Sequence, residues 1–301
     1  MKKQWTAADM PPQDDKLALV TGANRGLGLE ISVGLARAGA RVVMACRDAQ
    51  RAQDARAEVQ RRVPNAQVEL MSLDLADLAS VRAFAQAYAA KFPRIDILCN
   101  NASAIMVPLS KTRDGIEMHM GVNHFGHFAL TGLLLEQLKA APRARIVNTA
   151  SLAHRMTPGL DLDDLGWERK PYNVMHAYGQ SKLASLVYTF ELGRRLRKSG
   201  STIVAAAAHP GYTATNPDLG GFFMRLSTRL FAQAPAMGAL PALYAATMPD
   251  VTDGDYLGPG GMKELGGAPK KVRAREEAYD GALGARLWAL SEQLTGVRYL
   301  D

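Results

Sequence analysis

The chain has 301 residues, 48% of them hydrophobic, which is enough to bury a sizeable core in one large domain or two ordinary ones. Its formal net charge of +7 and sequence pI near 9.4 suit an anionic partner: nucleic acid, a membrane surface or a phosphorylated small molecule. The densest basic groups, residues 194–198 and 270–275, lack interleaved aromatic side chains, which argues against nucleic acid, and no run of about eighteen apolar residues predicts a membrane span.

The chain contains only two cysteines, Cys46 and Cys99, each inside an apolar, strand-like run. Neither has metal-ligand or disulfide spacing, so we expect both to be reduced core residues. His154, His176 and His209 also lack ligand spacing, so no metal site is predicted. The first sixteen residues are polar and contain prolines, without the apolar core of a signal peptide. These patterns favour a cytoplasmic protein.

Short apolar runs alternate with longer segments of helical spacing along the chain. The runs predict strands at residues 17–20, 41–45, 68–73, 95–98, 145–147 and 202–208. Such alternation is typical of an α/β fold with a doubly wound parallel sheet of Rossmann type, helices on both faces and ligands beyond the carboxyl ends of the strands. No linker or repeat divides the chain, so residues 1–301 are predicted to form a single domain, with 1–15 an N-terminal extension and 212–301 the substrate-side and C-terminal part.

A glycine-rich loop, TGANRGLG at residues 21–28, follows the first predicted strand. Gly22 can end the strand in a turn, Gly26 lets a bound group approach the backbone, and Gly28 allows close packing of the helix that begins there. The free amides and positive dipole end of that helix suit a pyrophosphate. Because such glycine patterns also arise by chance, the loop alone leaves a turn without a ligand equally open.

A tyrosine and a lysine stand four residues apart in the segment AYGQSK, at Tyr178 and Lys182. On a helix they share one face, where the ammonium can lie near the phenol. A nearby cation favours the phenolate and brings the phenol closer to exchanging protons at neutral pH. Ser151, after the strand predicted at 145–147, can donate a hydrogen bond to a substrate oxygen. Alone, a tyrosine and lysine at this spacing are more often a pair on a helix surface.

Together these patterns resemble the short-chain dehydrogenase/reductase family. The family's motifs occur in their usual order: TGxxxGxG at 21–28, LDL at 73–75, NNA at 100–102, a Ser/Tyr/Lys set at extended spacing, and HPG at 209–211. Within the family, the segments ACRD, NHFGHFALT, IVNTASLAH and LWALSEQLTG look most similar to the retinol-dehydrogenase-like and protochlorophyllide-reductase-like branch. The resemblance covers roughly residues 16–260.

The resemblance implies an oxidoreductase that transfers hydride between NADP(H) and the carbonyl or alcohol carbon of a small-to-medium apolar substrate. In this family the tyrosine is the general acid/base, and an asparagine holds a water that connects the lysine to solvent. The implied catalytic set is Asn123, Ser151, Tyr178 and Lys182.

The resemblance also places individual residues along the dinucleotide. Asp74 should lie at the adenine, Asn101 near the adenosine ribose, and Thr215 at the nicotinamide carboxamide. The full set implied to bind the cofactor is Gly22, Asn24, Arg25, Gly26, Leu27, Gly28, Cys46, Arg47, Asp74, Leu75, Asn101, Ala102, Tyr178, Lys182, Pro210, Gly211 and Thr215.

The end of the second predicted strand, VVMACRD, favours NADP over NAD. A chain that binds NAD usually has an acidic residue there, which accepts hydrogen bonds from the ribose 2′-hydroxyl and would repel a 2′-phosphate. Here the position is the uncharged Cys46, while Arg47 beside it and Arg25 in the glycine loop offer donors suited to a phosphate. The alternative is that both arginines are merely solvated.

Two departures from the family pattern bear on the site. Ser103 stands where the family usually has the glycine of NNAG, and it either shifts the loop beside the nicotinamide ribose or is simply tolerated. The catalytic serine and tyrosine are 27 residues apart, farther than in most of the family. The extra segment is either a flap at the active-site mouth, with Trp167, Tyr172 and Met175 as apolar substrate contacts, or a surface excursion that packs its own aromatic side chains.

Two other functions stay open. The same fold could reduce an activated carbon–carbon double bond, or the chain could be a binding protein that senses the dinucleotide without catalysis. The intact catalytic set argues against a sensor, which has no use for a positioned proton donor. No nucleic-acid or membrane partner is expected, and a homo-oligomer is left open.

Overall fold

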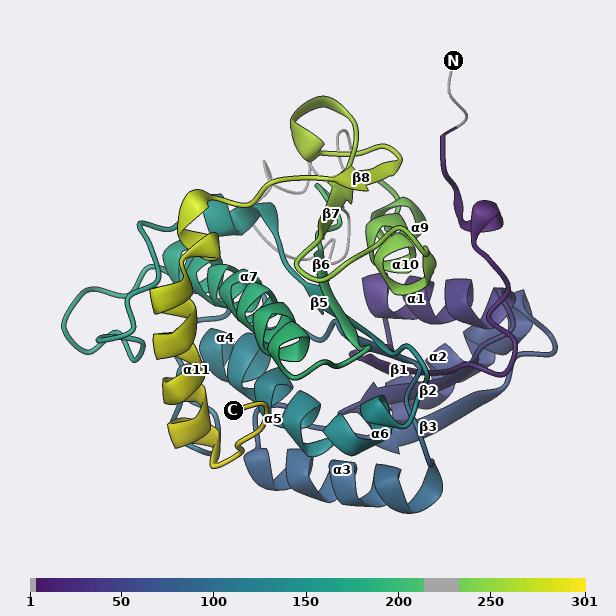
Figure 1. Ribbon diagram of the computed structural model, residues 1–301, viewed down its shortest axis with the longest axis horizontal. Helices are drawn as coiled ribbons and strands as arrows, with labels where there is room; N and C mark the ends of the chain where they lie inside the picture. Colours follow the sequence, from purple (N-terminus) through teal and green to yellow (C-terminus); the bar gives the residue numbers. More distant parts are fainter. Residues whose placement is uncertain (1–3, 214–232) are drawn as a thin grey trace.

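The computed structural model of the protein describes residues 4–213 and 233–301. In these residues the chain forms one eight-stranded sheet, in the order β3-β2-β1-β4-β5-β6-β7-β8 (Figure 1). Strands β1 to β7 pair in parallel, and β8 pairs antiparallel with β7. The strands are β1 Leu17–Thr21, β2 Arg41–Cys46, β3 Val68–Ser72, β4 Ile97–Asn100, β5 Arg145–Thr149, β6 Val204–Ala208, β7 Tyr256–Pro259 and β8 Pro269–Lys271. The predicted doubly wound Rossmann fold is confirmed.

Helices cover both faces of the sheet (Figure 1). One core lies under α3 (Leu78–Lys91), α5 (Gly126–Leu133), α6 (Leu135–Lys139), α7 (Val174–Lys198) and α11 (Gly281–Thr295). The other lies under α1 (Gly26–Arg37), α2 (Ala49–Arg62) and α10 (Leu240–Thr247). Successive strand residues alternate between the two cores: in β1, Leu19 belongs to the first and Val20 to the second. Because both faces are buried, the strands read as continuous apolar runs.

The strand order reverses beside β1. The chain runs outward from β1 through β2 to β3 and then returns to place β4 on the other side of β1. The loops that follow β1 and β4 therefore diverge, which opens a crevice at the carboxyl ends of the strands. This crevice is where the predicted motifs lie.

Side-chain caps distinguish α1 from other long helices. In α2, α3, α7 and α11 the residue before the helix accepts hydrogen bonds from first-turn amides, through Asp48, Asp77, Asn173 and Asp280 respectively. By contrast, α1 begins after Arg25 without a side-chain cap. Its first-turn amides are therefore not used by a protein side chain at the N-cap.

The C-terminal residues share the core of the sheet. The Tyr299 hydroxyl lies 2.9 Å from the Tyr188 hydroxyl of α7 and donates to the Phe128 carbonyl of α5. At the other end of the chain, the Trp5 ring packs edge-on against Tyr244 of α10, with centroids 5.1 Å apart. Shorter segments are η1 Ala7–Asp9, α4 Met118–Met120, η2 Gly121–Phe125, η3 Leu152–Arg155, α9 Pro235–Gly238, η4 Met262–Glu264 and η5 Glu276–Tyr279. Within residues 4–213 and 233–301, no helix is both long and apolar enough to span a bilayer.

Candidate active site

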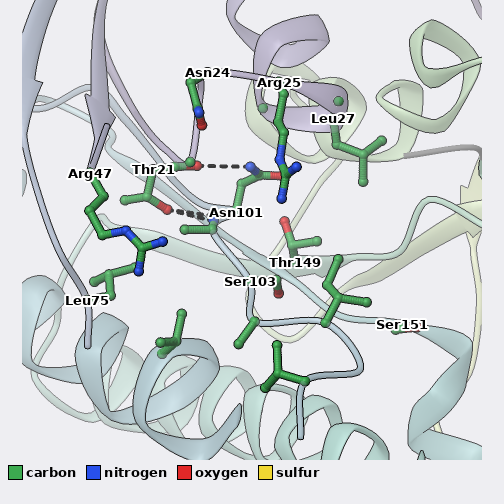
Figure 2. A pocket seen from close by; sticks show the side chains of 18 of the residues that line it. Thr21, Asn24, Arg25, Leu27, Arg47, Leu75, Asn101, Ser103, Thr149 and Ser151 are labelled. Carbon is green, nitrogen blue, oxygen red and sulfur yellow. Dashed lines mark hydrogen bonds between the residues drawn. The ribbon is translucent and has the colours of Figure 1, made fainter. Parts of the chain in front are cut away.

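A cavity of about 960 Å³ opens at the carboxyl ends of β1, β2, β4 and β5 (Figure 2). Its volume lies within the usual range for small-molecule and cofactor sites. Most residues implied by the family resemblance line it, namely Gly22, Asn24, Arg25, Gly26, Leu27, Gly28, Arg47, Asp74, Leu75, Asn101, Ala102, Ser151, Tyr178, Lys182, Pro210 and Gly211. Thr215 lies outside the described residues.

Hydrogen bonds between β1 and β4 hold the glycine loop in place (Figure 2). The Asn101 side chain donates to the Thr21 carbonyl at 2.9 Å, and the backbone amides of Asn101 and Ala102 both donate to the Thr21 hydroxyl. Gly22 and Gly26 have φ of 63° and 54°, a left-handed conformation that favours glycine. A side chain at Gly28 would collide with the Gly22 carbonyl and the Asn101 amide. The loop thus brings the uncapped start of α1 to the cavity wall.

Three arginines line the cavity near the glycine loop and the end of β2. Figure 2 shows the guanidinium groups of Arg25 and Arg47 turned toward its interior. Arg51, in the first turn of α2, also lines it, although its side chain is 63% exposed and pairs with Asp48 at 3.4 Å. The sequence analysis missed Arg51; its position in the helix that follows Arg47 was the available signal.

Cys46 lies beneath the glycine loop instead of lining the cavity. Its residue is only 4% exposed, and its thiol accepts hydrogen bonds from the backbone amides of Ala23 and Asn24. Burial raises the pKa of this thiol to about 11, against the opposing effect of those hydrogen bonds. Cys46 contacts the loop that borders the cavity, and its contact with a cofactor stays a prediction.

The cavity brings Ser151, Tyr178 and Lys182 together at the end of β5. The Lys182 nitrogen lies 5.8 Å from the centre of the Tyr178 ring. It donates to the Thr149 carbonyl at 2.9 Å and to the Ser103 hydroxyl at 2.6 Å. The spacing of the two residues predicted that phenol and ammonium share one helix face, and in α7 they do.

The pKa of Tyr178 is raised, whereas the sequence analysis expected the nearby cation to favour the phenolate. Burial raises the pKa of Tyr178, and a hydrogen bond from Ser151 opposes this rise only in part. Burial also lowers the pKa of Lys182 to about 7. Burial therefore has the largest effect on the pKa of Tyr178, and the phenol is protonated at neutral pH.

Asn123 fastens the loop after β4 to α7. It lies in η2, a turn of π-helix between α4 and α5, and such turns are frequent at functional sites. Its side chain accepts from the Ala104 amide at 2.8 Å, donates to the Ala104 carbonyl at 3.0 Å and donates to the Ser181 hydroxyl at 2.9 Å. Asn123 is not among the cavity-lining residues, and its water-holding role stays a prediction.

The chain is similar to known proteins in both sequence and structure. A family model described as short chain dehydrogenase matches residues 16–161. Human retinol dehydrogenase 13 is 39% identical over 298 residues, a match that covers 94% of this chain and 85% of that protein. Human retinol dehydrogenase 11 is 41% identical over 286 residues, with 94% and 86% covered. The chain belongs to the short-chain dehydrogenase family.

Within the short-chain dehydrogenases, this chain belongs to the retinol-dehydrogenase-like branch and is an oxidoreductase. A solved structure of an uncharacterized protein from Mycobacterium paratuberculosis is 40% identical, covers 99% of both chains and has a TM-score of 0.82. The NADP active-site complex of Pseudomonas aeruginosa RhlG is 25% identical, covers 81% of this chain and 94% of that chain, and has a TM-score of 0.62.

In this short-chain dehydrogenase, residues 103–108 form a wall of the cavity, which we call the β4 loop. Three side chains, Glu117, His119 and Tyr172, hold its far end, and we call them the clamp. The Val107 amide donates to His119 Nε2 at 3.2 Å, and the Val107 carbonyl accepts from the Tyr172 hydroxyl at 3.1 Å. His119 Nδ1 lies 2.8 Å from the Glu117 carboxylate, and both side chains are buried.

The extra segment between Ser151 and Tyr178 touches the cavity only indirectly. Trp167, Tyr172 and Met175 are not among the lining residues. Trp167 is 8% exposed and packs edge-on against Tyr172, with centroids 5.4 Å apart. Trp167 therefore packs within the segment itself, as the second of the two predictions has it. Tyr172 instead contacts the cavity wall, through its hydrogen bond with Val107.

Proposed function

We propose that this protein is an NADPH-dependent reductase of carbonyl compounds, or in the reverse direction an alcohol dehydrogenase, that acts on small-to-medium apolar substrates. The observation that carries the proposal is one cavity lined both by the glycine loop and by Ser151, Tyr178 and Lys182. A nucleotide site and an acid/base group thereby share a single space. The cytoplasmic location and a homo-oligomeric state stay predictions from the sequence.

The residues present fit a dinucleotide. The first-turn amides of α1 lack a side-chain cap and face the cavity, as a pyrophosphate requires. Gly26, whose φ of 54° favours glycine, lines the cavity without a side chain beside that position. Asp74 and Leu75 line the same end of the cavity, where an adenine would lie. These features support binding of the phosphorylated half of the cofactor.

The choice of NADP over NAD rests on charge. Arg25 and Arg47 offer planar donor groups for a 2′-phosphate, and Arg51 adds a third cation. Asp48, which also lines the cavity, offsets part of this charge through its ion pair with Arg51. The NADP complex of a relative with the same fold gives further support.

The chain's own residues supply orientation and a proton. When bound, NADPH would supply the hydride that reaches the carbonyl carbon. Tyr178, whose raised pKa keeps the phenol protonated, donates the proton to the carbonyl oxygen. Ser151 donates a hydrogen bond to the same oxygen, and Lys182 holds the cofactor beside it. In the oxidation direction Tyr178 must instead accept a proton, so that direction requires a higher pH.

The direct test is to incubate the purified protein with NADPH and a panel of aldehydes, ketones and enones while following nicotinamide absorbance. Oxidation of NADPH with apolar aldehydes or ketones is the expected result. Turnover of enones whose double bond alone is reduced would instead establish the carbon–carbon reductase. Tight NADPH binding without turnover of any class would indicate a sensor and overturn the proposal.

A further inference from the structure

We propose that Ser103 is a positioning residue that fixes the ammonium of Lys182, an inference that rests on the proposed function. Ser103 occupies the position at which the family usually has glycine, at the start of the β4 loop. Its hydroxyl accepts a hydrogen bond of 2.6 Å from the Lys182 nitrogen, across 79 residues of sequence. The side chain that replaces the glycine is thus a direct partner of Lys182.

The number of donors on the ammonium explains what this contact does. An ammonium has three N–H groups. Ser103 accepts from one and the Thr149 carbonyl accepts from another, so the protein uses two of the three. Lys182 is 2% exposed and lines the cavity, which leaves the remaining N–H for a ligand there. With two partners, one in the β4 loop and one in β5, the direction of that N–H is fixed; with Thr149 alone, the ammonium could turn.

The contact also bears on the charge of Lys182. No ion pair of Lys182 with a carboxylate occurs among the described residues, and its titratable neighbours are Tyr178 on α7 and His127 on α5. Burial lowers the pKa of Lys182 to about 7 and that of His127 to about 3, so His127 is neutral. A hydroxyl that accepts a hydrogen bond from the charged amine favours that form. Ser103 therefore keeps Lys182 protonated to a higher pH than an alanine variant would.

The first experiment needs no cofactor. The pKa of Lys182 is measured by NMR titration of isotope-labelled lysine ε-carbons, with Lys182→Ala to identify the signal. We expect S103A to lower this pKa by about one unit, a tenfold change in the protonation equilibrium, and S103T, which keeps the hydroxyl, to restore it. An unchanged pKa in S103A, or a lowered one in S103T, would overturn the inference.

The second experiment measures the dissociation constant for NADPH at about pH 6 and about pH 8.5, on either side of the Lys182 pKa. Binding by S103A should weaken about tenfold relative to the unmodified protein at the higher pH and much less at the lower one. Ser199→Ala, which removes an exposed hydroxyl at the C-terminal end of α7, should change neither value. Equal weakening at both pH values would indicate a merely structural role.

Two further controls keep the outcomes separate. Thermal unfolding reports whether S103A is folded. If it is not, S103G takes its place, because it also lacks the hydroxyl and carries the residue that is usual in the family. Failure of the unmodified protein to bind NADPH would count against the proposed function, whereas the NMR titration would still decide whether Ser103 holds Lys182.

Discussion

At the scale of single residues, the site depends on which polar atoms are already used by the protein. The Lys182 ammonium donates hydrogen bonds to the Ser103 hydroxyl and the Thr149 carbonyl. The Asn123 side chain accepts a hydrogen bond from the Ala104 amide. In the proposed mechanism, the phenol of Tyr178 exchanges a proton with the substrate, assisted by Ser151. Variants of these residues should therefore separate proton transfer from cofactor binding.

Replacing Tyr178 by phenylalanine removes the proposed proton donor and little else from the cavity. We expect turnover to fall by about 10²- to 10⁴-fold, the usual contribution of general acid catalysis, while NADPH affinity stays nearly unchanged. Steady-state rates and a fluorescence titration with NADPH check both parts. Tyr244→Phe, which removes a phenol on α10 bound to Asp250, should keep its activity. Substantial residual turnover in Tyr178→Phe would rule out the proposed acid.

Arginine variants test the choice of cofactor. Arg47→Ala or Arg25→Ala removes one charge-assisted contact with a 2′-phosphate, so NADPH affinity should fall about ten- to a hundredfold while NADH affinity is unaffected. Arg61→Ala, an exposed arginine on α2 paired with Glu58, is the matched control. A ratio of NADPH to NADH affinity that stays constant in both variants would show that the arginines are only solvated. Cys46 is a poor position for this test because an aspartate there would lie under the glycine loop.

At the scale of elements, the clamp connects the extra segment to the cavity. Tyr172 belongs to that segment, whereas Glu117 and His119 lie at the start of α4. His119 and Tyr172 both bind the backbone of Val107, and the Glu117 carboxylate binds both of these side chains. The His119 ring also lies 5.9 Å from the Tyr178 ring, centre to centre. The segment can thus influence substrate binding through the shape of the β4 loop, without touching the substrate.

Tyr172→Phe removes the hydroxyl that binds the Val107 carbonyl and keeps the ring that packs on Trp167. The loss of one hydrogen bond of about 1 kcal/mol should loosen the β4 loop and raise KM for apolar carbonyl substrates about fivefold, with kcat and NADPH affinity little changed. Kinetics over a panel of substrates check the split, with Tyr279→Phe as a control away from the cavity lining. Identical KM values in variant and unmodified protein would show that the clamp has no such role.

At the scale of the whole molecule, the site lowers stability. Lys182 is buried, and its pKa of about 7 lies below the value of the unfolded chain, so the unfolded state binds more protons between these two values. Stability therefore rises as the pH increases from about 7 toward the unfolded pKa near 10.4.

Lys182→Met should accordingly raise the free energy of unfolding by about 2 to 4 kcal/mol at neutral pH, because it removes the desolvated ammonium. The gain should shrink as the pH rises, since the lysine then folds in its neutral form. Urea unfolding of both proteins at several pH values checks this, and a gain that does not depend on pH would contradict it. Lys139→Met, an exposed lysine on α6, serves as the control.

The fold was largely predictable from sequence, and the site only in outline. Strands β1 to β6 follow apolar runs, and the glycine loop and the pair in α7 depend on local spacing. β7 and β8 escaped prediction because YLGP and PKK are short, contain proline and show no apolar periodicity. The hydrogen bond between Ser103 and Lys182 joins segments that are far apart in the sequence, and so does the clamp. Only the folded chain reveals such contacts.

The antiparallel strand β8 forms one margin of the sheet (Figure 1). An open margin is a template on which a second polypeptide can add a strand, the first step toward aggregation. Here Pro269 has no amide hydrogen to offer, and Lys270 adds an exposed positive charge, whereas the ammonium of Lys271 pairs with Asp255 at 2.8 Å. Two copies brought together along this margin would place the two Lys270 charges close to each other, and each strand would lack the amide donor of Pro269. Association of the protein by continuous extension of its sheet across β8 is therefore disfavoured, and any homo-oligomer should use another surface.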